Sequence, residues 1–180
     1  MSTTRTSGIN TSDFDAVYPF HQSLAIAGTQ HRDGLCGAFS TIFLQSMLSA
    51  QPLQEFKNPN YKALYSQAVK TQTRICALER DGEDGDALAF HEMNLETQLH
   101  VIQANKVKET LQRSKVALLK YKTRTGEFHQ IGFGRLFEKC VIHDSNRFTG
   151  VAKCDLAYAS LREIILENGG TQITINSLPR

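Results

Sequence analysis

Apolar residues in the front half of the chain recur at helical spacing. Three helical segments are predicted there. The two later ones cover residues 61–71 and about 88–114, and the segment over 88–114 is either continuous or interrupted. The acidic, glycine-containing stretch 79–87 separates them as a loop. The first and clearest helix is predicted from residue 35 to about residue 50, with apolar positions at Leu35, Phe39, Ile42, Phe43 and Met47.

The second half of the chain changes to short apolar segments with partial alternation and turn residues between them. A helix is predicted over residues 154–170, because it closes with Asn-Gly-Gly. Since a helical front half precedes most of the strands, the predicted fold class is α+β with an antiparallel sheet. The predicted strands are 115–123, 127–134, 139–145 and 171–178.

The composition predicts one globular domain behind a short leading segment. Residues 1–16 are rich in Ser and Thr and poor in large apolar groups, which predicts a disordered or loosely draped segment. Hydrophobic residues make up 41% and charged residues 21% of the 180 positions, as in ordinary globular proteins. We therefore expect residues 17–180 to form a single domain.

The charge and hydropathy of the chain argue against some partners. The formal net charge is only +2, from 20 Lys+Arg against 18 Asp+Glu, so neither nucleic acid nor an anionic membrane is expected as the main partner. No apolar run approaches the length of a membrane span, and we expect no integral membrane segment. The N-terminal stretch also lacks the hydrophobic region of a classical secretory signal.

Four cysteines, Cys36, Cys76, Cys140 and Cys154, could in principle form two disulfides. A chain of this size does not need disulfides to build a core, and it carries no classical export signal. We therefore expect all four cysteines to be reduced thiols.

Cys36 lies where the first predicted helix begins. Free backbone N–H groups and the positive end of the helix dipole stabilise a thiolate at such a position. Gly34 and Gly37 leave room for a substrate to approach the sulfur closely. The alternative is a small core residue, which is common for a cysteine at the start of an apolar helix. A nucleophilic role requires a base. The choice between a nucleophile and a core residue therefore depends on which histidines the rest of the chain offers.

His129 and Asp144 are the candidates for this base and for the carboxylate that orients it. If the second and third predicted strands form a hairpin centred near Leu136 and Phe137, positions whose numbers sum to 273 face each other, as His129 and Asp144 do. Their Cβ atoms would then lie about 5 Å apart on one face, where a carboxylate can fix the imidazole tautomer. Because Leu-Phe is a poor two-residue turn, we expect a longer loop over residues 135–138.

Two rival arrangements of the same residues are weaker. His143 follows directly before Asp144, so in a strand it points to the opposite face and is expected to be a partly exposed or hydrogen-bonded histidine. Cys140, His143 and Cys154 are suitable zinc ligands by type. However, Cys140 and His143 would face opposite sides of a strand, and no second close pair exists. We therefore expect neither a metal nor a cofactor.

A thiol nucleophile also needs donors for the oxyanion that forms during attack. The backbone N–H of Cys36 is the first expected donor. Gln30 could supply a side-chain amide as the second, although a surface glutamine is an equal alternative.

The order of these residues resembles that of the papain-like cysteine proteases. In both, a cysteine at a helix start precedes a long helical insert, a histidine on one strand and an aspartate just past the next. Gln30, six residues before Cys36, has the papain spacing. Through Gly34-Leu35-Cys36, His129-Gln130-Ile131-Gly132 and Asp144-Ser145-Asn146, the details are most similar to the YopT/AvrPphB family of bacterial type III effector proteases. The chain departs from the pattern of that family at Ser145, where the family has proline, and it has no Trp for the nucleophile helix.

This resemblance implies a papain-like fold and a thiol hydrolase that cleaves an amide bond in a protein substrate. Cys36 would attack as the thiolate, His129 would move the proton, and Asp144 would orient His129. The resemblance also implies a virulence effector, present in the bacterial cytoplasm before secretion and then delivered into a host cell. The Ser- and Thr-rich N-terminus would suit a type III secretion signal.

Other functions fit part of the same pattern. A glutamine deamidase or transglutaminase would use the same triad, because the acylation step is identical. A peptidoglycan amidase of the NlpC/P60 type fits less well, since that family usually carries an Asp-Cys pair at the nucleophile. In a non-catalytic binding protein, the cysteine and the histidine would both be structural.

Overall fold

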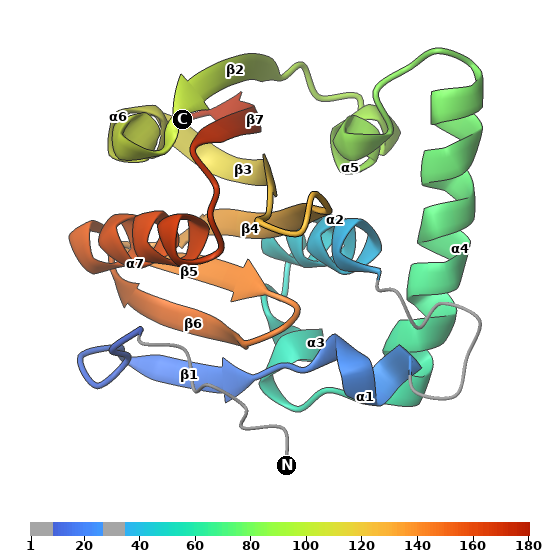
Figure 1. Cartoon of the computed structure of the whole chain (residues 1–180). Helices are drawn as coiled ribbons and strands as arrows, with labels where there is room; N and C mark the ends of the chain where they lie inside the picture. Colours follow the sequence, from blue (N-terminus) through green and yellow to red (C-terminus); the bar gives the residue numbers. More distant parts are fainter. Residues whose placement is uncertain (1–8, 27–34) are drawn as a thin grey trace.

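A seven-stranded antiparallel sheet runs through the centre of the computed structural model, which describes residues 9–26 and 35–180 (Figure 1). The strand order is β1-β6-β5-β4-β3-β7-β2, so β4 and β5 are interior strands while β1 and β2 form the two edges. The strands are β1 (Ala16–Pro19), β2 (Gln98–Gln103), β3 (Ser114–Lys122), β4 (Phe128–Leu136), β5 (Lys139–Asp144), β6 (Phe148–Lys153) and β7 (Gln172–Pro179).

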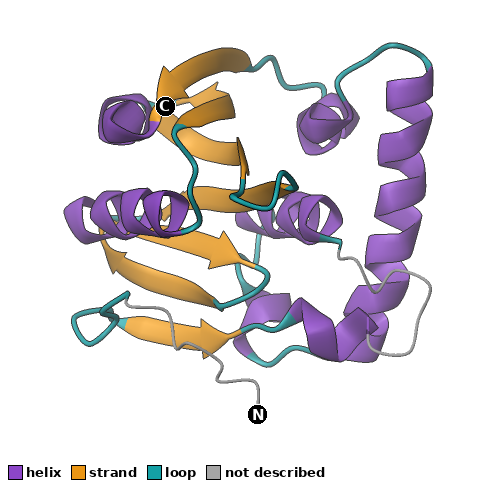
Figure 2. Ribbon diagram, in the orientation of Figure 1, coloured by secondary structure: helices purple, strands orange, loops and turns teal. Residues whose placement is uncertain are grey.

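Helices cover both faces of the sheet (Figures 1 and 2). On one face, α7 packs on β5 and β6 while α6 packs on β3 and α7. On the other face, α2 lies on β4, and α3, α4 and α5 pack around α2. The short helix α1 packs on α4. The helices are α1 (Gln22–Ile26), α2 (Cys36–Met47), α3 (Gln54–Lys57), α4 (Tyr61–Arg80), α5 (Leu88–Glu92), α6 (Val107–Gln112) and α7 (Cys154–Glu167), with 3-10 turns at η1 (Gly85–Ala87) and η2 (Ala104–Lys106).

Each face of the sheet has its own hydrophobic core, and the interior strands contribute to both. In β3, Ala117 and Leu119 belong to the core under α7, whereas Val116 and Leu118 belong to the core under α2. Successive side chains of a strand point to opposite faces, so a strand buried on both sides becomes a nearly continuous apolar run. This explains why the sequence of β3 alternates only partly.

Two glycines let α2 lie very close to β4. A Cβ atom at Gly132 would contact the ring of Phe43, and one at Gly134 would lie 2.7 Å from Cε of Met47. Phe43 and Met47 are buried residues on the sheet-facing side of α2. The absence of side chains at both glycines therefore sets how near the helix comes to the strand.

The predicted α+β class is confirmed, but the front half is less helical than expected. Within the predicted helical region 88–114, the residues of β2 form an edge strand that pairs with β7. Leu99 and Val101 of β2 are 61% and 59% exposed, so the apolar residues there do not form the buried stripe of a helix. The sequence also gave no prediction for β1 and β6, and α4 extends beyond the predicted end at residue 71 to Arg80.

The described part of the leading segment packs on the domain. Ile9 is buried in the core under α7, and Phe14 makes an edge-to-face contact with Phe148. The backbone N–H of Asp15 donates to the carbonyl of Val151 at 2.8 Å, just before β1 joins the sheet. The folded domain therefore includes residues before the expected boundary at residue 17.

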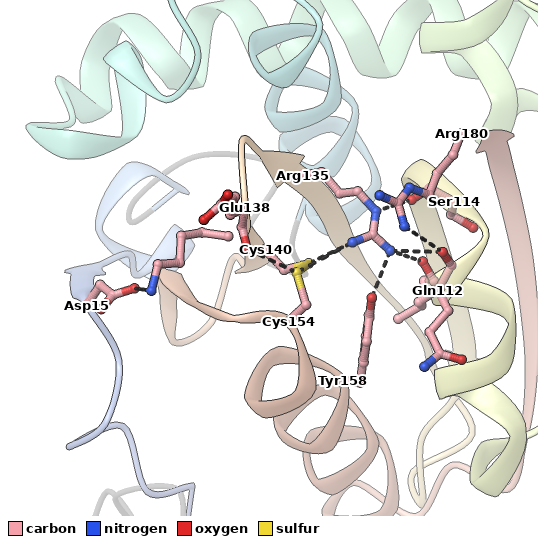
Figure 3. Close-up of a disulfide and its surroundings, with 11 residues drawn as sticks. Asp15, Gln112, Ser114, Arg135, Glu138, Cys140, Cys154, Tyr158 and Arg180 are labelled. Atoms are coloured by element: carbon pink, nitrogen blue, oxygen red, sulfur yellow. Dashed lines mark hydrogen bonds and ion pairs between the residues drawn. A yellow bond between two sulfur atoms is a disulfide. The ribbon is translucent and has the colours of Figure 1, made fainter.

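The expectation of four reduced thiols is wrong for two of them. Cys140 of β5 and Cys154, the first residue of α7, form a disulfide (Figure 3). Cys140 pairs with Ala152 of β6 across the sheet, and Cys154 follows two residues later, which brings the two sulfurs together. This proximity depends on β6, a strand that the sequence did not predict. Cys36 and Cys76 remain free thiols.

Arg135 holds the surroundings of the disulfide together (Figure 3). Its Nη1 lies 3.4 Å from both sulfurs. Its Nε donates to the carbonyl of Ser114 at 2.8 Å, and its Nη2 donates to the carbonyl of Leu111 and to the hydroxyl of Tyr158, each at 2.7 Å. One guanidinium thus connects β4 with β3, α6 and α7.

The contact between α2 and β4 can be tested with one added methyl group. Gly132→Ala forces the Cβ atom against the ring of Phe43, which is itself tightly packed, and we expect a loss of about 1–3 kcal/mol in the free energy of unfolding. Gly134→Ala is the matched variant. It meets the flexible side chain of Met47 and should cost less. Urea denaturation measures both, and an equal or reversed order would contradict the packing described.

Candidate active site

Cys36 is the first residue of α2, as the sequence predicted. It lies partly exposed between two pockets of about 200 and 380 Å³. The smaller pocket extends towards α4, where Gln72, Ile75 and Glu79 line it. The larger one extends towards the end of α7, where it is lined by Asn168. The sulfur is therefore reachable from two sides along one surface.

His129 and Asp144 form a buried hydrogen bond. His129 lies near the start of β4 and Asp144 is the last residue of β5. Nε2 of His129 is 2.9 Å from Oδ1 of Asp144, and the two residues are only 7% and 2% exposed. The prediction that these two residues lie together is confirmed, although the hairpin register from which it was derived is wrong.

The hairpin register differs from the predicted one by two positions. Leu136 pairs with Lys139, so the turn consists of Phe137 and Glu138 rather than the expected loop over 135–138. Phe137 has a φ of 57° and is almost fully exposed, a conformation that bulky residues rarely adopt. Because the shift is an even number, His129 and Asp144 stay on the same face, as diagonal rather than directly opposed neighbours.

His129 also interacts with Cys36. Burial alone would raise the pKa of the Cys36 thiol, but the hydrogen bond and charge of His129, with backbone groups of Gln130 and Gly37, lower it below its ordinary value of 9.0. Since Nε2 of His129 bonds Asp144, Nδ1 is the nitrogen that remains for the sulfur. The imidazole thus stands between a thiol and a carboxylate.

The electrostatics favour a charged pair at Cys36 and His129. Burial would lower the pKa of His129, but its hydrogen bonds to Asp144 and Cys36 raise it to about 10. Burial likewise opposes ionisation of Asp144, whereas His129, the backbone of Asn146 and Arg147 lower the pKa of this carboxyl. At neutral pH this arrangement stabilises a thiolate beside an imidazolium, with an ionised carboxylate behind it.

Three neighbouring residues, Asn146, Arg147 and Tyr121, contact Asp144 or His129. Oδ1 of Asp144 also accepts the backbone N–H of Asn146 at 2.9 Å, and Oδ2 lies 3.3 Å from Nε of Arg147. The ring of Tyr121, directly opposite His129 on β3, packs edge-on at 5.7 Å between centroids. Of these, only Asn146 was named from the sequence, as part of Asp144-Ser145-Asn146.

Gln130 contributes an unusual buried group beside Cys36. Its backbone carbonyl accepts the hydroxyl of Ser40 on α2 at 3.1 Å. Its side-chain Nε2 and Oε1 have no hydrogen-bond partner among the described residues, although the residue is only 3% exposed. An unpaired buried amide costs about 1–3 kcal/mol, so the fold tolerates a local cost next to the thiol.

His143 is a core residue on the other face of the sheet. It is fully buried among Phe20, Phe43 and Phe56, with ring centroids 4.9–5.2 Å away. Nδ1 pairs with the hydroxyl of Thr149 at 2.9 Å. Burial lowers the pKa of His143 to about 3, so the imidazole is neutral. The predicted face is thus the observed one, and of the two expected environments the residue is hydrogen-bonded but not partly exposed.

Gln30, the expected side-chain donor to an oxyanion, lies outside the described residues. The backbone N–H of Cys36 belongs to the first turn of α2, where no carbonyl of the same helix is available to it. Among residues 9–26 and 35–180, no group of three His, Cys, Asp or Glu side chains could hold a metal ion. In the same ranges, no helix has both the length and the apolar character needed to cross a membrane.

Comparisons with known proteins place the fold in one class. No protein-family model and no curated protein sequence matches the chain. Among solved structures, the chain is similar to the Pseudomonas avirulence protein AvrPphB, with a TM-score of 0.66 and 13% identity over 94% of this chain and 100% of that one. It is also similar to PatoxP, a cysteine protease-like domain of the Photorhabdus asymbiotica toxin PaTox, with a TM-score of 0.56 and 11% identity over 92% of this chain and 54% of that one.

These similarities define the fold as papain-like and, more particularly, as AvrPphB-like. The match spans all of AvrPphB in that structure, so it includes both the helical part around α2 and the antiparallel sheet. The resemblance seen in three short sequence patches thus holds at the level of the fold.

The two histidines on opposite faces give a paired test of the site. His129→Ala should remove the enhanced reactivity of Cys36, and it also lowers the melting temperature because it leaves the buried Asp144 carboxylate without this partner. His143→Ala should leave that reactivity intact but destabilise the protein by about 3 kcal/mol, since it empties a space between three phenylalanines. Thermal melts and the alkylation rate of Cys36 measure the two effects. Exchanged phenotypes would contradict the assignment of the two faces.

Proposed function

We propose that the chain is a cysteine protease in which Cys36 is the nucleophile, His129 the general acid–base and Asp144 the group that orients His129. The observation that supports it best is the buried hydrogen bond between His129 and Asp144 beside Cys36, whose pKa the neighbouring His129 lowers. It occurs at a helix N-terminus, beside two open pockets, in a fold similar to that of a cysteine protease-like domain. A thiol, a base and an orienting carboxylate in this order are the parts that nucleophilic catalysis requires.

The reaction follows from the protonation states favoured in the site. The Cys36 thiolate attacks the carbonyl carbon of an amide, and the carbonyl oxygen takes the negative charge, which the backbone N–H of Cys36 stabilises. The His129 imidazolium then gives its proton to the amide nitrogen, the C–N bond breaks, and a thioester remains on Cys36. Neutral His129 next takes a proton from water, which attacks the thioester and releases the acid. The proton stays on His129 and the thiolate is restored.

We further propose a protein substrate and a role as a bacterial effector. AvrPphB is an avirulence protein and PatoxP is part of a toxin, which favours action on another organism's proteins. The open position of Cys36 between two pockets suits an extended peptide segment passing over the sulfur. In this proposal the chain is made in the bacterial cytoplasm and reaches a host cell by secretion.

A peptide library tests the proposal directly. Incubation with the wild-type protein should generate new peptide N-termini, and Cys36→Ala should generate none while keeping the wild-type melting temperature. Ammonia release without new termini would instead identify a glutamine deamidase or transglutaminase, since these share the acylation step. If neither new peptide N-termini nor ammonia appears, thiol catalysis on peptides is refuted.

The lowered pKa of Cys36 predicts selective alkylation at acidic pH. At about pH 6 an ordinary thiol is about one part in a thousand thiolate, so iodoacetamide should modify Cys36 at least about 100-fold faster than the exposed Cys76. The advantage should narrow as the pH rises above 9, where ordinary thiols ionise. Peptide hydrolysis should decline as the pH rises through about 10, because His129 then loses its proton. Mass spectrometry of both sites gives the rates, and equal rates at pH 6 would contradict the ion pair.

Asp144→Asn separates orientation of His129 from a turn-forming role. The amide oxygen can still accept the backbone N–H of Asn146, so the fold should remain. An amide cannot stabilise the imidazolium, and the corresponding change in the Ser-His-Asp template costs about 10⁴-fold, so we expect a loss of orders of magnitude. The nitrophenolate burst with p-nitrophenyl acetate measures acylation of Cys36. Asp155→Asn, which breaks an exposed ion pair with Lys108, is the control. A near wild-type burst in Asp144→Asn would remove Asp144 from the site.

A further inference from the structure

Gln22, the first residue of α1, uses its backbone N–H and both polar atoms of its side chain in one buried cluster. The residue is 6% exposed. Its backbone N–H donates to the carbonyl of Ser145 at 2.7 Å, and its side-chain Oε1 accepts the backbone N–H of Leu35 at 2.7 Å. Its Nε2 donates to Oγ of Ser145 at 3.0 Å and to Oδ1 of Asn146 at 2.6 Å. No motif or spacing in the sequence singles out this glutamine.

These contacts join the chain neighbours of two site residues. Leu35 directly precedes Cys36, while Ser145 and Asn146 directly follow Asp144. The backbone N–H of Asn146 in turn donates to Oδ1 of Asp144. Side-chain interactions and chain neighbours together form a closed ring. It runs from Cys36 to His129, Asp144 and the loop after it, and returns through Gln22 and Leu35 to Cys36.

The hydrogen-bond inventory of Gln22 leaves its side chain without a donor for an oxyanion. A primary amide has two N–H donors, and both are directed to neighbouring side chains. The backbone N–H of Leu35 can donate only to an oxygen, which fixes the amide with Oε1 towards α2 and Nε2 towards the loop. Gln22 therefore has no donor left for an oxyanion and can act only through the residues it holds.

We propose that Gln22 is a positioning residue that sets the distance between Cys36 and His129, a role that rests on the proposed function. Cys36 belongs to α2 and His129 to β4, and the thiolate–imidazolium pair requires hydrogen-bond distance between the two side chains. Gln22 fastens the start of α2 to the same loop that holds Asp144, and Asp144 holds His129. Without that connection the start of α2 can move relative to His129, and the pKa of Cys36 returns towards that of an ordinary thiol.

The test measures the pH dependence of Cys36 alkylation by iodoacetamide in the full chain. Gln22→Met keeps the length of the side chain but removes its hydrogen bonds. We expect the rate at about pH 6 to fall at least about ten-fold while the rate at about pH 10, where any thiol is ionised, stays within about two-fold. Gln22→Glu keeps an acceptor for Leu35 but cannot donate to Ser145 and Asn146. Its alkylation rate at pH 6 should therefore lie between that of the wild type and that of Gln22→Met.

A matched control separates this role from general destabilisation. Gln45 is a glutamine on α2 itself, and its Nε2 donates to Glu92 at 2.8 Å, away from Asp144. Gln45→Met should leave the pH profile unchanged even where it lowers the melting temperature. A folded Gln22→Met with wild-type alkylation at pH 6 would overturn the positioning role. Should Gln22→Met not fold, Asn146→Ala removes the receiving carbonyl instead, and an unchanged profile there would also overturn it.

The wild-type pH profile separates a failure of the proposed function from a failure of the role of Gln22 alone. Wild-type protein whose Cys36 reacts no faster than Cys76 at pH 6 would refute the proposed function, and the role of Gln22 with it. Wild-type protein with fast Cys36 and unaffected Gln22 variants would refute the role of Gln22 alone. A reduced rate at pH 6 in both Gln22→Met and Asn146→Ala, with Gln45→Met unchanged, would support both.

Discussion

The close packing of α2 against β4 is the contact on which the candidate site depends. Gly132 and Gly134 remove the side chains that would hold the helix away from the strand. The hydroxyl of Ser40 bonds the backbone of β4 directly, at the carbonyl of Gln130. Because β4 continues to His129 just beyond this contact, the first residue of α2 comes to lie beside the imidazole. Backbone packing therefore brings the thiol and the base close to each other, and the proposed connection through Gln22 then holds the start of α2 at the distance that the pair requires.

The charges of the site are stabilised by fixed hydrogen bonds, because burial opposes them. Burial by itself disfavours the thiolate, the imidazolium and the Asp144 carboxylate alike. Each is stabilised instead by a neighbour: Asp144 accepts from His129 and Asn146, and Arg147 adds a positive charge on its other oxygen. Such buried pairs contribute little to stability compared with apolar packing. Their presence here favours the proposed catalytic role over a purely structural one.

A structural feature could be predicted from the sequence where the residues that indicate it are close together in the chain. The helix from Cys36, the strands β3, β4, β5 and β7, and the helix α7 all have residues whose spacing alone predicts them. The edge strand β2 does not, since Leu99 and Val101 are apolar yet exposed, and periodicity cannot tell which face is buried. The candidate pair His129 and Asp144 was found because a hairpin register shifted by two keeps the same face. Gln22 could not be found, because its partners lie 13 to 124 positions away.

The disulfide raises the question of whether the fold requires an oxidising compartment. Cys140 and Cys154 enclose only a short loop, and closing a short loop removes less entropy from the unfolded chain than closing a long one. The same region is also held by Arg135, whose bonds to Ser114, Leu111 and Tyr158 do not involve sulfur. Reduction would remove one covalent bond but leave β4, α6 and α7 joined through the guanidinium. The region of the disulfide therefore has a second, redox-independent connection, which is compatible with the proposed action in the reducing cytosol of a host cell.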